Sequence, residues 1–122
     1  MKNKLTKKEE EIMNMFWDYG PMFVRDVQEH YEEPKPALTT TSTMVRILES
    51  KGFVGHKAFG NTYQYFPLVS CEDYKKSSLF GVISDYFENS YLKAVSALVK
   101  EDKISVEELK DLIAQIEAGK EA

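Results

Sequence analysis

The sequence has few of the residues that several functional classes require. Its 122 residues include a single cysteine, Cys71, and two histidines, His30 and His56. One cysteine excludes an internal disulfide framework, and neither histidine has a partner at the spacing of a metal site. The glycines are scattered, so the sequence contains neither a P-loop nor a dinucleotide-binding fingerprint. We therefore expect no enzymatic activity, no cofactor and no metal ion.

Long apolar runs are absent as well. No stretch approaches the roughly 20 apolar residues of a membrane-spanning helix. The first residues, MKNKLTKKEEE, are charged and lack the apolar segment of a secretory signal. With the single cysteine, this predicts a cytoplasmic protein that does not insert into a membrane. The chain can still bury a core, because 43% of its residues are hydrophobic.

A strong excess of positive charge is also missing, since the net charge is −4. Residues 1–70 carry nine basic and nine acidic side chains, whereas residues 71–122 carry seven basic and eleven acidic ones. The acidic second part should face away from phosphate, which leaves any contacts with nucleic acid to the first part.

The most informative stretch spans residues 37–67 and predicts a helix followed by a β-hairpin. The helix ends at Gly52, a residue suited to a left-handed C-cap. The strands Phe53–Ala58 and Thr62–Pro67 then flank Gly60-Asn61, two residues that suit turns with positive φ. A helix followed by such a hairpin is typical of a winged helix.

This helix has one side that is suited to DNA, as its residues show when they are spaced at roughly 100°. The apolar side carries Leu38, Thr41, Met44, Val45 and Leu48. The opposite side carries Thr39, Ser42, Thr43, Arg46 and Ser50. Short hydroxyl side chains and one arginine can approach base edges and phosphates closely. The alternative is a solvated surface, but threonine is a mediocre helix former, so the run TTTST is costly for that role alone.

Two further helices are predicted before this stretch. The first, Leu5–Tyr19, begins with a capping-box signature made by Thr6 and Glu9 and ends at Gly20-Pro21. Its apolar residues are expected to lie in the core. The second, Phe23–Tyr31, is short.

Some side chains outside the long helix are also candidates for contact with the DNA backbone. Arg25 and Gln28 lie away from the apolar stripe of the short helix, where they either reach a phosphate or are ordinary surface. His56, Lys57 and Asn61 are expected on or near the tip of the hairpin, where a wing can touch DNA.

Residues 71–122 predict three more helices: Cys71–Glu88, Tyr91–Lys100 and a last one that starts with a capping box at Ser105 and ends at Gly119. Helices of this length cannot bury such broad apolar faces alone. They either fold back on the first domain or self-associate, and self-association explains them better. A two-fold dimer would place two recognition helices about 34–36 Å apart, on successive faces of the major groove.

We therefore expect a mainly α chain with a small β-hairpin. A winged helix-turn-helix DNA-binding domain is predicted over residues 1–70 and a helical dimerisation domain over residues 71–122. The residues assigned to dimerisation are Leu79, Phe80, Ile83, Phe87, Leu109, Leu112, Ile113 and Ile116.

Four segments resemble the penicillinase-repressor family of winged-helix regulators: LTKKEEEIMNMFWDYGP, TTTSTMVRILESKGFV, YQYFPLVSCEDY and KISVEELKDLIAQI. The similarity spans about residues 5–118. Its most specific parts are the Lys51-Gly52 junction and the Tyr-x-Tyr-x-Pro-Leu-Val segment that ends at Val69. The family includes methicillin-resistance repressors and copper-transport repressors.

The resemblance implies a homodimeric repressor that binds a dyad-symmetric operator in double-stranded DNA and blocks transcription. It implies dimerisation through the helices after Cys71 and wing contacts around Lys57 to Asn61. It implies DNA contact from Thr39, Thr40, Ser42, Thr43 and Arg46, among which Thr40 lies at the flank of the polar side.

Three departures from the family pattern bear on regulation. Recognition helices of the family commonly carry an arginine at the place of Ser42 and an Arg-Leu pair before the Lys-Gly junction, whereas here the arginine, Arg46, comes one position earlier. We therefore expect an operator different from that of the staphylococcal relatives. A membrane sensor-protease cleaves β-lactam-responsive members at an Asn-Phe bond. The pair at the corresponding position here is Ala97-Leu98, which differs from Asn-Phe. Such a protease is therefore retained only as a candidate partner. Copper-responsive members end in clustered cysteines, and a lone Cys71 does not support that mechanism.

Two functions remain open at this point. One is a dimeric DNA-binding repressor, and the other is a winged-helix module that binds protein through its late helices. Substitutions on the threonine-rich side would abolish or weaken DNA binding in the first case and do little in the second.

Overall fold

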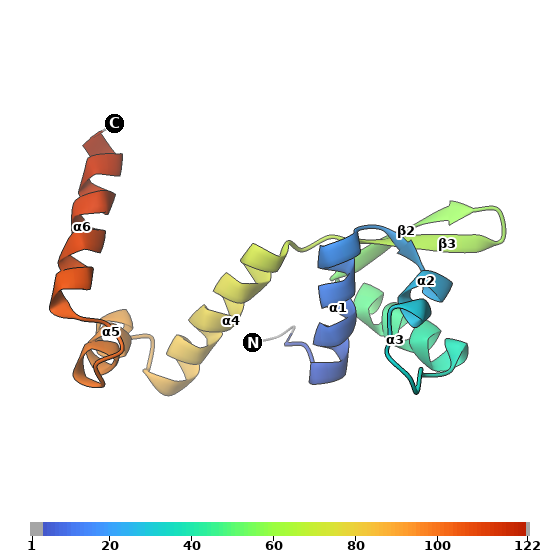
Figure 1. Ribbon diagram of the computed structural model, residues 1–122, viewed down its shortest axis with the longest axis horizontal. Helices are drawn as coiled ribbons and strands as arrows, with labels where there is room; N and C mark the ends of the chain where they lie inside the picture. Colours follow the sequence, from blue (N-terminus) through green and yellow to red (C-terminus); the bar gives the residue numbers. More distant parts are fainter. Residues whose placement is uncertain (1–3, 122) are drawn as a thin grey trace. The chain divides into compact units, whose positions relative to one another are not determined.

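The computed structural model describes residues 4–121, except for the side chains of residues 120 and 121. Within that range it contains six helices and three strands (Figure 1). In chain order they are α1 (Lys7–Tyr19), β1 (Met22–Phe23), α2 (Val24–Glu29), α3 (Leu38–Ser50), β2 (Val54–Phe59), β3 (Thr62–Pro67), α4 (Cys71–Tyr86), α5 (Tyr91–Lys100) and α6 (Val106–Glu121).

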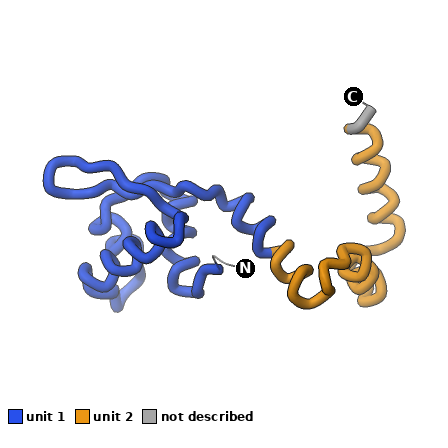
Figure 2. Tube along the Cα trace, turned by 180° about the vertical axis from the view of Figure 1, so that it is seen from behind, with its two compact units in different colours: residues 1–78 blue, residues 79–122 orange. Residues whose placement is uncertain are grey.

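The chain divides into two compact units, of which the first ends at Ser78 and the second begins at Leu79 (Figure 2). The boundary falls inside α4. The first half of α4 belongs to the first unit, because the buried Tyr74 ring contacts the rings of Trp17 and Phe53 there.

The first unit is a winged helix, as the sequence predicts. Its antiparallel sheet has the order β1-β3-β2, and β2 and β3 form the predicted hairpin with Phe59 opposite Thr62. Positive φ occurs at Gly60, with a value of 60°, and not at Asn61. Positive φ at the first turn residue alone is the pattern of a type II′ hairpin turn, which glycine adopts without strain.

Strand β1 is not predicted by the sequence. Met22 and Phe23 pair with Tyr65 and Gln64 of β3, so Phe23 is extended and the expected start of the second helix at this residue is wrong. The helix begins one residue later because the Asp26 carboxylate accepts the Phe23 backbone N–H at 3.0 Å and caps the helix.

The predicted ends of the other helices in the first unit rest on local chemistry. Thr6 and Glu9 form the expected capping box, so Thr6 stays extended and α1 begins at Lys7 rather than Leu5. Gly20 and Gly52 follow α1 and α3 with φ of 80° and 86°. A residue with positive φ at this place ends a helix, and glycine adopts such a φ readily.

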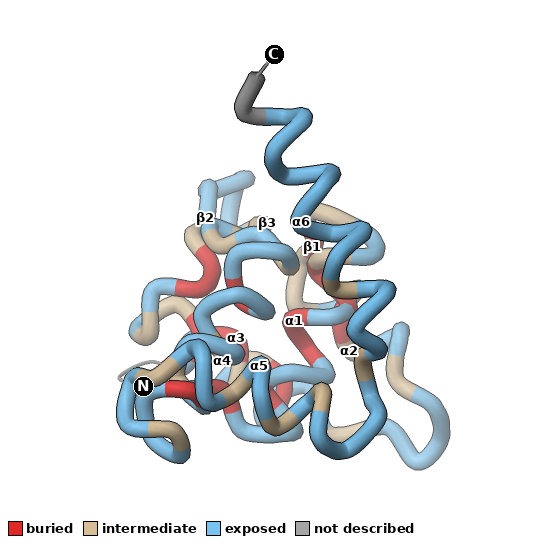
Figure 3. Tube along the Cα trace, turned by 90° about the vertical axis from the view of Figure 1, so that its left-hand side faces the viewer, coloured by how far each residue is buried: buried red, intermediate tan, exposed pale blue. Residues whose placement is uncertain are grey.

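The hydrophobic core lies in the first unit (Figure 3). Among the described residues, every buried hydrophobic side chain except Ile83 belongs to this unit. The core side chains are Leu5, Ile12, Met13, Met15, Phe16, Met22, Val27, Val45, Leu48, Phe53, Val54, Tyr65 and Tyr74. Two residues of the first unit that are expected on apolar sides are exposed. Leu38 lines a groove beside α2, and Tyr19 is 61% exposed and stacks on His30.

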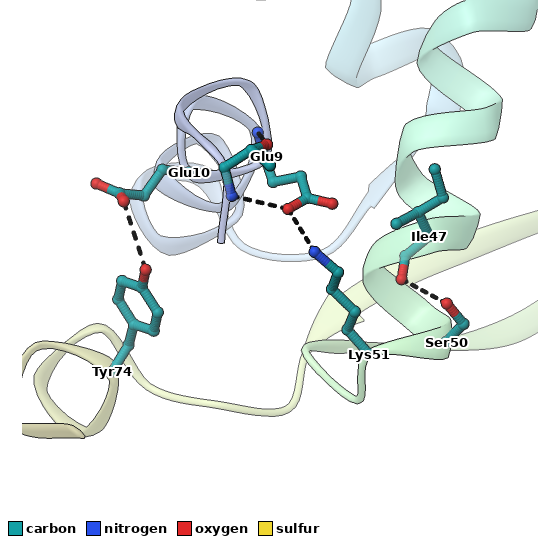
Figure 4. Close-up of polar contacts among 7 residues, drawn as sticks. Glu9, Glu10, Ile47, Ser50, Lys51 and Tyr74 are labelled. Carbon is teal, nitrogen blue, oxygen red and sulfur yellow. Dashed lines mark hydrogen bonds and ion pairs between the residues drawn. The ribbon is translucent and has the colours of Figure 1, made fainter. Parts of the chain in front are cut away.

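An ion pair joins the start of α1 to the end of α3 (Figure 4). The Lys51 Nζ lies 2.7 Å from Oε1 of the buried Glu9 carboxylate, which also accepts the backbone N–H of Thr6 at 2.8 Å. Burial opposes ionisation of Glu9, but the bonds from Lys51 and Thr6 outweigh it and lower its pKa. The segment that follows β3 is also fixed to α1, since the Trp17 indole N–H donates to the Val69 carbonyl at 2.9 Å.

The second unit contains the end of α4 together with α5 and α6. α4 ends at Tyr86, two residues earlier than expected, and the left-handed residues Glu88 and Asn89 follow it. α5 has the predicted bounds, and Ser105 and Glu108 form the predicted capping box. The expected stop at Gly119 is wrong, because α6 runs on to residue 121. A glycine costs only about 1 kcal/mol inside a helix. Along residues 4–121, no helix is both long and apolar enough to cross a membrane.

Loss of the Lys51 ammonium should destabilise the first unit. We expect Lys51→Met to lower the free energy of unfolding at neutral pH by about 1–3 kcal/mol, because the buried Glu9 charge loses a partner. The lowered pKa of Glu9 means that its contribution is present above the unfolded-state value and is lost as the pH falls through the folded-state value. The difference from the wild type should therefore shrink when urea unfolding is repeated well below pH 4.5, the ordinary glutamate value.

Lys76→Met is the matched control, because Lys76 pairs with Glu72 at 3.1 Å on an exposed surface of α4. It should change the unfolding free energy by less than about 0.5 kcal/mol. Equal losses in the two variants would contradict a structural role for the Glu9–Lys51 pair.

Candidate nucleic-acid interface

The exposed side of α3 carries the polar residues that the sequence predicts. Thr39, Thr43 and Arg46 are exposed and Ser42 is half-buried. They face outward because the opposite side of the helix is anchored in the core by Thr41, Val45 and Leu48. This separation follows from the helical period of about 3.6 residues.

The hydroxyl groups of α3 differ in what they can still bind. The Thr43 hydroxyl donates to the Thr39 carbonyl at 3.0 Å, which leaves its oxygen lone pairs as acceptors. The buried Thr41 hydroxyl donates to the Ala37 carbonyl at 3.1 Å. Arg46 forms no salt bridge with any residue between 4 and 119, so its guanidinium can bind an external acceptor.

A groove of about 780 Å³ lies between the start of α3, the start of α2 and strand β3. Its walls are mainly apolar and aromatic, with hydroxyls, one cation and one carboxylate among them. The lining residues are Phe23, Val24, Arg25, Asp26, Leu38, Thr39, Ser42, Thr62, Tyr63 and Tyr65. The structure therefore brings Thr39 and Ser42 together with Arg25.

Thr40 lies elsewhere. It lines a second groove of about 540 Å³ together with Lys8 and Glu11 of α1, His30 and residues of the loop that precedes α3. The structure does not bring Thr40 into the groove that Thr39 and Ser42 share.

Arg25 and Gln28 of α2 have different surroundings. The Gln28 side-chain amide donates to the Pro36 carbonyl at 3.0 Å and so holds the loop before α3. Arg25 is exposed and lines the larger groove. The sequence leaves its role open, because nothing near it in the chain indicates that α2 and the start of α3 share a groove.

The wing carries one cation and one amide toward solvent. Lys57 is exposed opposite Gln64, and its Nζ lies 5.5 Å from the centroid of the Phe59 ring. Asn61 lies in the two-residue turn and is exposed. Both are open to a ligand beside the wing.

The sequence predicts His56 on or near the tip of the hairpin, but the structure places it elsewhere. It lies within β2 opposite Tyr65, and its Nδ1 contacts the Glu49 carboxylate on α3. The prediction places it wrongly because only pairing along the strand and the contact with α3 fix its position. Burial raises the pKa of the Tyr65 phenol beneath it; Glu49 adds to this and Arg46 opposes it.

The residues assigned to dimerisation lie around the second unit. Leu79, Phe80, Leu112, Ile113 and Ile116 are each about half exposed, at 48–56%. Phe87 and Leu109 are partly exposed, whereas Ile83 is buried within the single chain. Ile83 can therefore pack beneath a dimer surface, but its buried side chain is not available to contact a second copy.

No group of three His, Cys, Asp or Glu side chains is arranged to hold a metal ion in the part of the chain that the structure describes. The chemistry offered by α3, α2 and the wing is instead that of hydrogen bonding and charge. The Arg25 guanidinium and the hydroxyls of Thr39 and Ser42 line a mainly apolar groove, while Arg46 on α3 and Lys57 on the wing are exposed outside it.

These features define a winged-helix protein with an additional helical region. Residues 5–118 match the family described as penicillinase repressor, and the chain belongs to that family of transcriptional repressors. It is similar to the methicillin resistance regulatory protein MecI of Staphylococcus aureus (strain N315) and of Staphylococcus epidermidis, with 25% identity over 110 residues in each case. The MecI protein of Mammaliicoccus sciuri is 24% identical over 110 residues, and each alignment covers 89% of both chains.

Proposed function

We propose that this protein is a sequence-specific DNA-binding repressor that acts as a homodimer on a dyad-symmetric operator. The observation that carries the proposal is the exposed side of α3, where Thr39, Ser42, Thr43 and Arg46 lie opposite a buried apolar side. Membership of the penicillinase repressor family supports it.

The major groove of DNA admits an α-helix, and hydroxyl and guanidinium groups can bind base edges there. Arg46 is the strongest of these donors, because its fork of N–H groups matches a guanine edge and is not used within residues 4–119. Thr39, Ser42 and Thr43 are short enough to let the helix backbone come close to the bases.

Backbone contacts would orient the helix. Arg25 lines the groove beside the start of α3, Lys57 and Asn61 lie on the wing, and all three are exposed. Contacts with phosphate fix register without reading sequence. The first unit as a whole is not strongly basic, so nonspecific affinity should be modest.

Dimerisation through the second unit explains its exposed apolar surface. Leu109, Leu112, Ile113 and Ile116 are spaced at three and four residues and form one stripe along α6. Three of these four side chains are about half exposed in the single chain. A second copy of the chain would cover them, and the acidic charge of this part would stay away from DNA.

Arg46→Ala should weaken specific DNA binding while the dimer persists. A duplex enriched by the wild-type protein from a random pool serves as the probe, and fluorescence anisotropy measures affinity in a salt series against an unrelated duplex. Loss of one base contact should reduce specific affinity by about 5- to 150-fold. Thr43→Glu should reduce it further, because a carboxylate would face the base edges and phosphates.

Lys76→Ala is the matched control, since it removes an exposed cation of the same unit on α4, outside the elements assigned to DNA contact. It should leave specific affinity within about twofold. If no duplex is enriched, or if the α3 variants bind like the wild type, the proposal is wrong. A role in binding protein would then be the better account of the late helices.

Leu112→Asp should convert the dimer to a monomer, because it puts a charge into the apolar stripe of α6. Sedimentation equilibrium would measure the change, and circular dichroism would establish that helix content is kept. Ala114→Asp is the matched control, because it introduces the same charge on the opposite side of α6. A dimer that survives Leu112→Asp, or that is lost equally in both variants, would exclude this stripe as the interface.

A further inference from the structure

His56 and Glu49 join the wing to the recognition helix. The imidazole Nδ1 of His56, on β2, contacts the Glu49 carboxylate in the last turn of α3. The side chains are 38% and 31% exposed, so water reaches the pair but does not surround it. It is a direct polar link between two elements that we assign to DNA contact.

The wing holds the imidazole in place from the other side. The His56 ring lies with its centroid 4.3 Å from that of Tyr63, tilted by 31°, and 5.7 Å from that of Tyr65. Tyr65 is buried directly opposite His56 in the sheet. The two tyrosines of β3 and Glu49 of α3 therefore fix where the ring lies.

The charge of the Glu49 carboxylate affects how Arg46 could bind DNA. Glu49 lies three residues after Arg46, hence on the same side of α3. Both charges act on the phenol of Tyr65, which places them near the same part of the wing. An unneutralised carboxylate beside Arg46 would repel phosphate and weaken the guanidinium as a DNA ligand. A protonated imidazole removes that repulsion.

We propose that His56 is a positioning residue whose protonation neutralises Glu49 beside Arg46, so that DNA binding takes up a proton and is tighter in mildly acidic than in mildly alkaline solution. This inference rests on the proposed function. The charged and titratable groups that contact the imidazole are Glu49 from α3 and Tyr63 and Tyr65 from β3, and Arg46 of α3 acts on the same Tyr65 phenol. Histidine is the side chain that normally changes charge between pH 5 and pH 8.

The test measures the affinity for the enriched duplex at about pH 6 and about pH 8, at constant ionic strength. The wild type should bind about three- to fivefold more weakly at the higher pH, the size expected for a partly exposed charge pair. His56→Gln should bind with the weaker affinity at both values. His56→Lys keeps a cation and should bind tightly at both.

Glu49→Gln separates charge from position. A glutamine oxygen can still accept a hydrogen bond from the imidazole, but the repulsive charge is gone. This variant should bind more tightly than the wild type at about pH 8, and its pH dependence should be reduced. His30→Gln is the matched control, because His30 is the only other histidine of the sequence and stacks on Tyr19 of α1. It should keep the wild-type pH dependence.

The outcomes distinguish this inference from the proposed function. Specific binding with a pH dependence that His56→Gln leaves unchanged overturns the inference and keeps the function. If no duplex is bound at either pH, the function fails, and a double-mutant cycle of His56→Gln and Glu49→Gln in urea unfolding decides the charge assignment. A coupling that is present at about pH 6 and falls by about pH 8 supports it, whereas a pH-independent coupling overturns it.

Discussion

Helix α3 has to fill the core and present a polar surface, and the fold of the first unit depends on how these two demands are separated. Val45 and Leu48 are fully buried, and Thr41 joins them because its hydroxyl is bonded to the Ala37 carbonyl. Turning the helix about its axis would expose Leu48 and bury the charge of Arg46, and both changes are unfavourable. The core thus determines which side chains face outward.

The Lys51-Gly52 junction transfers this orientation to the wing. Lys51 is held by Glu9 of α1, and Gly52 adopts the left-handed conformation that ends the helix. The backbone N–H of Phe53 then donates to the Leu48 carbonyl at 3.0 Å, so β2 leaves α3 in a fixed direction. A short stretch of chain therefore sets the angle between the helix and the hairpin.

The sequence predicts much of what local chemistry determines and misses what distant contacts determine. The capping boxes at Thr6 and Ser105 and the turn at Gly60 are local, and the structure contains all of them. Strand β1 has two residues and exists only because β3 pairs with it, so no pattern indicates it. The sequence also places His56 too close to the tip of the hairpin. Its position depends on a distant contact with Glu49, which forms only when the hairpin folds back on α3.

The first unit has little net charge, which limits how much electrostatic attraction could contribute to DNA binding. Nine basic side chains are balanced by nine acidic ones in residues 1–70, so counterion release can supply only part of the affinity. Base contacts from α3 must then supply much of the rest, and a homodimer would use them twice. In such a balance a single carboxylate beside Arg46 matters, because few cations are present to offset it. A histidine held against that carboxylate offsets it locally without adding a permanent positive charge that would strengthen nonspecific binding.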